Sequence, residues 1–261
     1  MERCLKKKEL QNEILQEVEN RDNWKLFGDL ITSNIYSIKK GMQKFTTVNF
    51  YSENLEEIEI PLDPNLTPSE NAQKYFKKYN KQKRTFIALQ EQIKNNDLEI
   101  IYLDNLIINL SGALNESDIE EIRDELIEQG YIKKQKNKKF KIKKSKPLHY
   151  ISSDNFDIYV GKNNRQNDDL TTNFASNNDI WLHTKNIAGS HVIIKTNGQI
   201  VPDTTLSEAA HLAAYYSKGQ NSSLVPVDYT PKKFVKKPNG AKPGMVIYES
   251  NKTIFITPDI N

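Results

Sequence analysis

Apolar side chains occur at helical spacing in the first forty residues. Between residues 2 and 40 they recur three or four positions apart, which predicts one long helix. Gly41 directly follows two lysines. Because cations favour the negative end of a helix dipole and glycine readily adopts a left-handed cap, the helix is expected to end at Gly41.

A second long helix is predicted from Thr67 to about Leu110. Thr67, the proline after it and Glu70 form the capping-box pattern of a helix start. The apolar residues that follow repeat every seven positions, as in a coiled coil. One column contains Ala72, Tyr79, Phe86, Ile93, Ile100 and Ile107, and the other contains Tyr75, Leu89, Leu103 and Leu110, with Gln82 and Asn96 as interruptions.

The similar lengths of the two helices favour an antiparallel hairpin. At 1.5 Å per residue, roughly 40 residues extend about 60 Å. Residues 42–67 would form the tip, where apolar runs at 45–50 and 58–62 predict a small β-hairpin. Residues 1–130 are therefore interpreted as a coiled-coil arm that can reach a second point on a large assembly.

A shorter helix and a basic run follow the arm. Ser117 is the expected cap of the helix and Gly130 its end. The seventeen positions 131–147 then contain nine lysines. This run is either a solvated linker or a site of RNA contact, because charge attracts polyanions without specifying one.

From residue 148 the pattern changes to short alternating runs typical of strands. Strands are predicted at 156–160, 192–195, 245–248 and 253–257, and an alanine-rich helix at 206–217 is expected to pack against the sheet. The predicted fold class is α+β. It comprises a long antiparallel coiled-coil arm with a small tip, a linker at 131–147 and a compact mixed α/β domain at 148–261.

Charge is divided unevenly along the chain. The formal net charge is +3. Residues 131–261 hold 20 Lys+Arg and 10 Asp+Glu, a net charge of +10, which leaves 17 and 24, or −7, for residues 1–130. Only the second half therefore has the charge expected of a polyanion binder.

The chain is expected to be cytoplasmic. It shows no signal-peptide pattern and no run of about 18 apolar residues that would cross a bilayer. Cys4 is the only cysteine, which excludes an intrachain disulfide and a cysteine-based metal cluster.

Five blocks in the second half resemble, in order, the NFACT-R module of the NFACT family. They are DIYVGKNNRQND at 157–168, DIWLHTK at 179–185, GSHV at 189–192, EAA with AAYYS at 208–217, and VDYT leading to KKPNGAKPG at 227–244. The first half resembles the coiled-coil middle segment of the same family. The relevant runs are LFGDL at 26–30, NIY at 34–36 and NAQKYFKKY at 71–79.

The resemblance implies a non-enzymatic factor of ribosome-associated quality control. Family members bind large ribosomal subunits obstructed by peptidyl-tRNA, recruit tRNA and support C-terminal alanine tailing of stalled nascent chains. The implied partners are large-subunit rRNA, the stalk-base protein and tRNA. Neither a membrane, a small-molecule substrate nor a cofactor is expected.

Three parts of the second half supply the expected RNA contacts. Residues 161–168 predict a flexible loop with cations and amides that suit phosphates or base edges, although the P-loop ending is missing. Residues 236–244 predict a proline-stiffened lysine loop, and 183–191 contribute two histidines and a lysine. The expected RNA-binding residues are Lys162, Asn163, Asn164, Arg165, Gln166, Asn167, His183, Lys185, His191, Lys236, Lys237 and Lys242.

Some of these residues permit other interpretations. Asp179, His183 and His191 suggest a metal or acid–base cluster, but the interval between the histidines differs from the four-residue helical spacing of paired ligands. The alternatives are hydrogen bonds that hold a turn, or RNA contact. No catalytic residue and no metal site are predicted. Tyr159 and Trp181 are interpreted as core residues or as platforms for unpaired bases, and the same applies to Tyr229.

An adhesin is the alternative function. Some members of the family carry the label fibronectin-binding protein A. The missing export and wall-anchoring patterns count against this interpretation. Salt-dependent binding to RNA, but not to fibronectin, would separate the two classes.

Overall fold

The structure is a computed structural model that describes residues 1–134 and 145–258 of the 261-residue chain. Most of the predicted basic run, residues 135–144, lies outside the described residues. The chain divides into two compact units, Glu2–Leu98 and Glu99–Asn261. The expected division at residues 130 and 147 stays a prediction. None of the described helices is long and apolar enough to cross a membrane.

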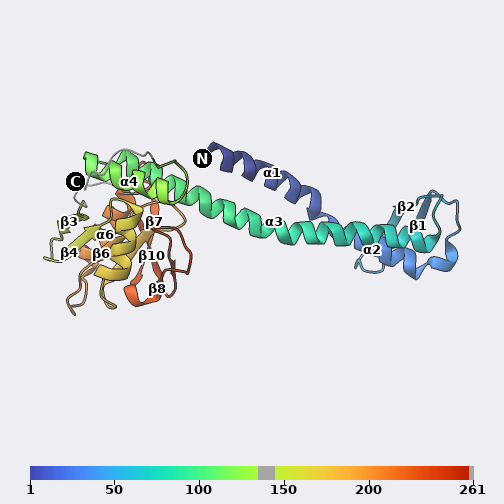
Figure 1. Ribbon diagram of the computed structural model, residues 1–261. Helices are drawn as coiled ribbons and strands as arrows, with labels where there is room; N and C mark the ends of the chain where they lie inside the picture. The colour runs from blue at the N-terminus through green and yellow to red at the C-terminus, as the bar shows by residue number, and fades with distance from the viewer. Residues whose placement is uncertain (135–144, 259–261) are drawn as a thin grey trace. The chain divides into compact units, whose positions relative to one another are not determined.

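In the first unit, two helices run antiparallel to a third, as Figure 1 shows. The elements are α1 (Glu2–Glu19), α2 (Arg21–Ser33), η1 (Ile35–Ser37), β1 (Lys44–Val48), β2 (Glu57–Pro61) and the first part of α3 (Pro68–Ser111). The Asn96 side chain donates to the carbonyl of Cys4 at 3.0 Å. Trp24 stacks on Tyr75, with ring centroids 5.8 Å apart. The start of α1 thus contacts the far part of α3, and α2 contacts the beginning of α3, which confirms the antiparallel hairpin.

The first helix differs from the prediction at two points. It is interrupted at Asn20 and ends at Ser33 instead of Gly41. The side chains of Thr32, Ser33 and Asn34 each donate to the carbonyl four residues earlier, at 2.7, 3.0 and 2.9 Å. Side chains that bind the backbone in this way compete with the helical ladder, which accounts for the earlier end. Gly41 has a φ of +97° but lies in a turn before β1.

Helix α3 begins as predicted. The Thr67 N–H donates to Glu70 Oε2 at 2.7 Å, and the Glu70 N–H donates to Thr67 Oγ1 at 3.3 Å. This is the reciprocal capping box. The helix then continues for 44 residues to Ser111, next to the predicted end.

The predicted β-hairpin at the tip is confirmed by the antiparallel pairing of β1 with β2. Residues of the hairpin and the helices share one core. Its buried members are Leu30, Ile31, Ile38, Ile60, Leu62 and Ala72. The turn between the strands leaves Phe50, Tyr51 and Leu55 exposed.

The second unit is built around a six-stranded antiparallel sheet with strand order β10-β7-β5-β6-β4-β3. Its elements after α3 are α4 (Glu116–Glu128), β3 (Leu148–Ile151), β4 (Asp157–Val160), α5 (Asn164–Asp169), a π-helical turn (Leu170–Phe174), β5 (Ile180–Thr184), β6 (Val192–Ile194), α6 (Asp203–Tyr215), β7 (Val225–Pro231), η3 (Lys232–Phe234), β8 (Val235–Lys236), β9 (Ile247–Tyr248) and β10 (Lys252–Ile256). β8 and β9 form a separate hairpin. The predicted α+β class is confirmed.

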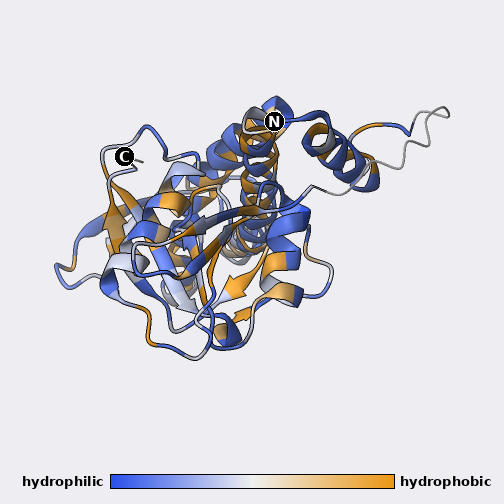
Figure 2. Ribbon diagram, turned by 90° about the vertical axis from the view of Figure 1, so that its left-hand side faces the viewer, coloured by the Kyte–Doolittle hydropathy of each residue, from blue (hydrophilic) through white to orange (hydrophobic). Residues whose placement is uncertain are grey.

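Apolar side chains pack on both faces of this sheet. Leu182 and Val227 lie in the core with the alanines of α6, whereas Trp181 and Ile193 lie in a second core on the opposite face. Neighbouring residues of one strand point to opposite faces, which explains the division. Figure 2 shows the resulting apolar strands among polar loops.

The coiled-coil repeat does not continue through the last part of α3, which belongs to the second unit. Tyr102 and Leu106 are buried there, whereas Ile107 and Leu110, both expected in the seam, are exposed. The two buried residues pack with Ile122 of α4. The buried face of α3 changes because its packing partner changes.

Candidate nucleic-acid interface

The segment expected to be an RNA-contacting loop contains a short helix, α5. Asn163 caps it: its Oδ1 accepts the N–H of Gln166 at 2.9 Å, and Gln166 Oε1 accepts the N–H of Lys162 at 3.1 Å. At Gly161, a Cβ would lie 2.1 Å from Asn167 Oδ1. The glycine therefore permits a close approach of two segments.

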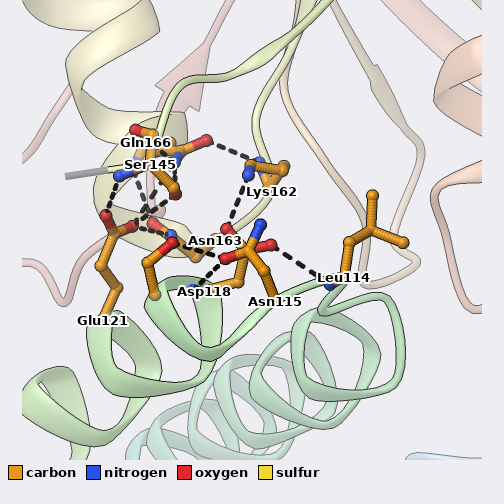
Figure 3. Close-up of polar contacts among 9 residues, drawn as sticks. Leu114, Asn115, Asp118, Glu121, Ser145, Lys162, Asn163 and Gln166 are labelled. Carbon is orange, nitrogen blue, oxygen red and sulfur yellow. Dashed lines mark hydrogen bonds and ion pairs between the residues drawn. The ribbon is translucent and has the colours of Figure 1, made fainter. Parts of the chain in front are cut away.

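An acidic face of α4 lies against α5 (Figure 3). Spacings of three and four residues place Asp118, Glu121 and Glu125 on one side of the helix. Lys162 Nζ donates to Asp118 Oδ1 at 2.6 Å, and Asn163 Nδ2 donates to Glu121 Oε2 at 2.6 Å. Two of the predicted RNA contacts are thus used within the protein.

Helix α4 is positioned by its own cap. Asn115, two residues before the predicted Ser117, accepts the N–H of Asp118 at 3.0 Å. The Asp118 carboxylate accepts the N–H of Leu114 at 3.2 Å. Burial acts to raise the pKa of Asp118, but the bonds from Lys162 and Leu114 outweigh it and hold that pKa below its ordinary value.

Glu125 is the centre of a buried polar cluster shared by α3, α4 and α5. Tyr102 Oη donates to Glu125 Oε1 at 2.7 Å, and Asn164 Nδ2 donates to the same oxygen at 2.9 Å. Asn109 Nδ2 lies 3.4 Å from Asn164 Oδ1. Burial raises the pKa of Glu125, and the two hydrogen bonds offset this only in part.

The next two polar side chains of α5 also have partners within the unit. Gln166 Nε2 donates to Ser145 Oγ at 2.7 Å, and the Ser145 N–H donates to Glu121 Oε1 at 2.6 Å. The Arg165 guanidinium lies 2.6 Å from the Glu128 carboxylate, and both side chains are partly exposed. Arg165 is thus the more accessible of the two cations in this segment, although its side chain is only 33% exposed, against 12% for Lys162.

The three lysines of the predicted loop have different environments. Lys237 forms an ion pair with Asp168, and Lys242 forms one with Glu99. Burial acts to lower the pKa of Lys242, but the bond to Glu99 raises it above its ordinary value. Lys236 on β8 is exposed, and its side chain has no hydrogen-bond or ion-pair partner in the described part of the chain. Two lysines therefore anchor the loop, and one faces solvent.

The two predicted histidines lie in hydrogen-bonded positions, His191 buried and His183 half-buried. His191 Nδ1 lies 2.7 Å from Thr171 Oγ1, and its backbone N–H donates to Asn167 Oδ1 at 3.0 Å. His183 Nε2 lies 3.3 Å from the carbonyl of Gly189. Burial lowers the pKa of both histidines, so the neutral form is favoured at pH 7.

Asp179 holds a turn, as the hydrogen-bonding alternative predicted. Its carboxylate accepts the N–H groups of Ser176 at 2.7 Å and Thr196 at 3.0 Å and pairs with Lys195. Across residues 1–134 and 145–258, no three His, Cys, Asp or Glu side chains are placed to hold a metal ion. Trp181 is fully buried, in agreement with its interpretation as a core residue.

The predicted RNA contacts thus fall into two groups. Most of the α5 side chains, together with both histidines and two loop lysines, make contacts within the unit. Lys185 and Lys236 are exposed. Sequence reasoning missed the α4 carboxylates that bind α5, although their spacing of three and four residues is a visible signal of one acidic helix face.

Two family models match the chain. "NFACT N-terminal and middle domains" matches residues 1–146, and "NFACT protein RNA binding domain" matches residues 146–250. Over 251 residues the chain is 50% identical to "Rqc2 homolog RqcH" of Bacillus subtilis, covering 94% of this chain and 43% of the relative. The chain therefore spans less than half the length of that relative.

Two further matches extend the comparison. A solved structure, the C-terminal part of the fibronectin/fibrinogen-binding protein from Streptococcus suis, has a TM-score of 0.72 and 35% identity. The match covers 99% of this chain and 89% of that one. The human ribosome quality control complex subunit NEMF is 29% identical over 79 residues, which are 30% of this chain and 7% of NEMF. These matches confirm the resemblance read from the sequence.

Proposed function

Because the chain belongs to the NFACT family, we propose that it is the RNA-binding portion of a ribosome-associated quality control factor. The match of residues 146–250 to the NFACT RNA-binding domain carries the proposal. The charge of +10 over residues 131–261, from 20 Lys+Arg and 10 Asp+Glu, supports binding to a polyanion.

In this proposal the whole factor acts in the cytoplasm as an adaptor without catalysis. It binds large subunits obstructed by peptidyl-tRNA and recruits tRNA for C-terminal alanine tailing. The similarity to "Rqc2 homolog RqcH" supports this role. Its RNA partners would be large-subunit rRNA and tRNA.

Phosphate contacts are assigned first to Lys185 and Lys236, because both are exposed and neither forms a close ion pair among the described residues. Lys237 is also exposed but is paired with Asp168. Arg165 is partly accessible and is a further candidate. The other predicted contacts would first have to give up partners within the protein. For Lys162, whose side chain is only 12% exposed and paired with Asp118, that exchange is unfavourable.

The tip, residues 42–67, is proposed to contact the stalk-base protein. The exposed Phe50, Tyr51 and Leu55 support a protein partner, because clustered apolar side chains favour protein contacts. Replacing the tip by a short turn is expected to weaken binding to intact subunits but not to naked RNA, since only subunits offer two attachment points. Equal binding of subunits by both forms would contradict this assignment.

Salt-dependent binding tests the proposed function. Affinity of the chain for large-subunit rRNA should fall steeply as salt rises, and Lys236→Ala should flatten the logarithmic slope by about 0.9 for duplex RNA contacts. Lys25→Ala, an exposed lysine on α2, is the control and should leave the slope unchanged. Affinity that does not respond to salt would contradict the proposal.

An adhesin is the second candidate, supported by the similarity to the fibronectin/fibrinogen-binding protein from Streptococcus suis. Immobilised fibronectin and rRNA can be compared under the same buffer conditions. Binding to fibronectin without binding to RNA would favour this candidate.

A further inference from the structure

The face of the sheet opposite α6 is covered in part by the β8–β9 hairpin. Tyr248 of this hairpin packs on Trp181, with ring centroids 4.8 Å apart. Its hydroxyl donates to Asp228 Oδ2 at 2.8 Å. The hairpin thus covers the side chains of Trp181 and Asp228 on this face.

The register of three strands defines the next row on the same face. Asp228 is paired with Thr253, whose hydroxyl donates to Asp228 Oδ1 at 2.6 Å. Two residues away, Pro226 is paired with Phe255, and its carbonyl accepts the N–H of Lys185 at 2.8 Å. Since side chains alternate between faces, Lys185, Pro226 and Phe255 lie in one row on the face of Asp228.

This row is exposed. Phe255 has 61% of its surface exposed, and neighbouring Leu224 has 56%. The Lys185 side chain is 46% exposed, and its Nζ lies 3.9 Å from Asp228 Oδ1. Asp228 already accepts hydrogen bonds from two hydroxyl groups, so it engages Lys185 only weakly. The ammonium group of Lys185 is therefore available to bind an external anion.

We propose that the row Lys185, Pro226 and Phe255 binds an unpaired nucleotide of RNA, with its base stacked on Phe255 and its phosphate held by Lys185. The inference rests on the RNA-binding function proposed above and names the RNA that the face would select. Every base has a π face that an exposed aromatic ring can receive. A cation beside that ring complements the flanking phosphate.

The site should distinguish unpaired from paired RNA. Bases within a duplex are stacked on their neighbours, whereas bases of single strands can be splayed onto an aromatic side chain. A duplex could still use Lys185 through its phosphates. Stacking on Phe255 is therefore the part of the contact that only single-stranded RNA would gain.

The test uses the full chain with a short oligouridylate and a blunt-ended RNA duplex. Phe255→Ala should weaken binding of the oligouridylate about 5- to 150-fold, the range of a lost base-stacking contact, and leave duplex binding unchanged. Phe255→Trp should restore binding. The fluorescence of the added tryptophan is obtained by subtracting the signal of the unaltered protein, which has 2 tryptophans. This added fluorescence should be quenched by the oligouridylate.

Two further variants complete the design. Lys185→Ala should flatten the salt slope for the single strand by about 0.7, as loss of one phosphate contact predicts. Ile151→Ala, which removes an equally exposed apolar side chain from the opposite edge strand β3, should change nothing. Thermal melting should be the same for all variants, because each side chain is exposed.

The outcomes separate this inference from the proposed function. If the unaltered chain binds both RNAs but Phe255→Ala binds the oligouridylate equally well, the stacking site is wrong and the RNA-binding function stands. An equal loss of both RNAs in Phe255→Ala would also overturn the stacking site. If the unaltered chain binds neither RNA, the proposed function itself fails.

Discussion

Two helix contacts in this chain have opposite chemistry. In the first unit, α2 meets α3 through stacked rings such as Trp24 and Tyr75. In the second, α4 meets α5 and the residues just before it through bonds from Asn164 and Lys162 to buried carboxylates. Truncating an apolar side chain in such a contact lowers stability in proportion to the buried apolar volume that is removed. Removing one partner of a buried polar contact instead leaves the other partner unsatisfied, at the full cost of its lost hydration. Single substitutions should therefore act differently in the two places.

The largest effect is expected from Lys162→Met. This change leaves Asp118, with a side chain only 3% exposed, without its ion-pair partner. Breaking a buried pair on one side costs about 3–5 kcal/mol. The loss can be measured by denaturant unfolding of the second unit, with hydrogen exchange as the readout. Lys6→Met breaks a pair on α1 whose side chains are 72% and 82% exposed, and it should change stability by less than about 0.5 kcal/mol.

A graded loss is expected from Leu89→Ala in the apolar seam. Leu89 is buried on α3, and truncation of a core leucine to alanine costs about 2–5 kcal/mol. Hydrogen exchange should increase in the first unit. Ile87→Ala, at an exposed position on the same helix, is the control. If hydrogen exchange in the Leu89→Ala variant is unchanged, the seam contributes little to stability.

The polar contact should also respond to pH through Glu125. Because its folded-state pKa is raised above 4.5, its contribution to stability is fully present below pH 4.5 and is lost as pH rises through the folded-state pKa. Glu125→Gln removes this dependence. The melting temperature of Glu125→Gln relative to the unaltered chain should therefore rise with pH. If the difference in melting temperature does not change with pH, the pKa of Glu125 is not raised. Glu53→Gln, at an exposed site, serves as the control.

The smallest effect is a gain at Gln11, a buried polar residue on α1. Neither amide atom of Gln11 has a hydrogen-bond partner among the described residues. Gln11→Leu removes two unsatisfied groups and should stabilise the first unit by about 1 kcal/mol. Chemical denaturation can resolve this gain. A loss of stability would indicate that water or a partner satisfies the amide.

Local rules predicted the parts of the fold that depend on neighbouring residues. The capping box of Thr67 and Glu70 and the β-hairpin at the tip are both present. β7 was missed because Pro226, Asp228 and Pro231 are unusual in a strand. Asp228 is accommodated through hydroxyls on Tyr248 and Thr253, which are distant in sequence and which no local pattern reveals.

For the candidate site, the sequence pattern cannot say which hydrogen-bond donors are already used within the protein. The amides of Asn163 and Asn164 look available to RNA in the sequence. In the structure they bind carboxylates about forty residues earlier, on α4. Nothing in the spacing of either segment specifies that pairing. The exposed row at Phe255 was equally hidden, because it exists only through the register of three strands.

The acidic face of α4 also has a practical consequence for fragments of this protein. The RNA-binding family match begins at residue 146. This start lies after Asp118, Glu121 and Glu125 but before their partners Lys162, Asn163 and Asn164. A fragment cut there would release Lys162 and the amides beside it as free donors. Such a fragment should bind polyanions indiscriminately, and its apparent affinity for RNA would include contacts that the longer chain keeps for itself.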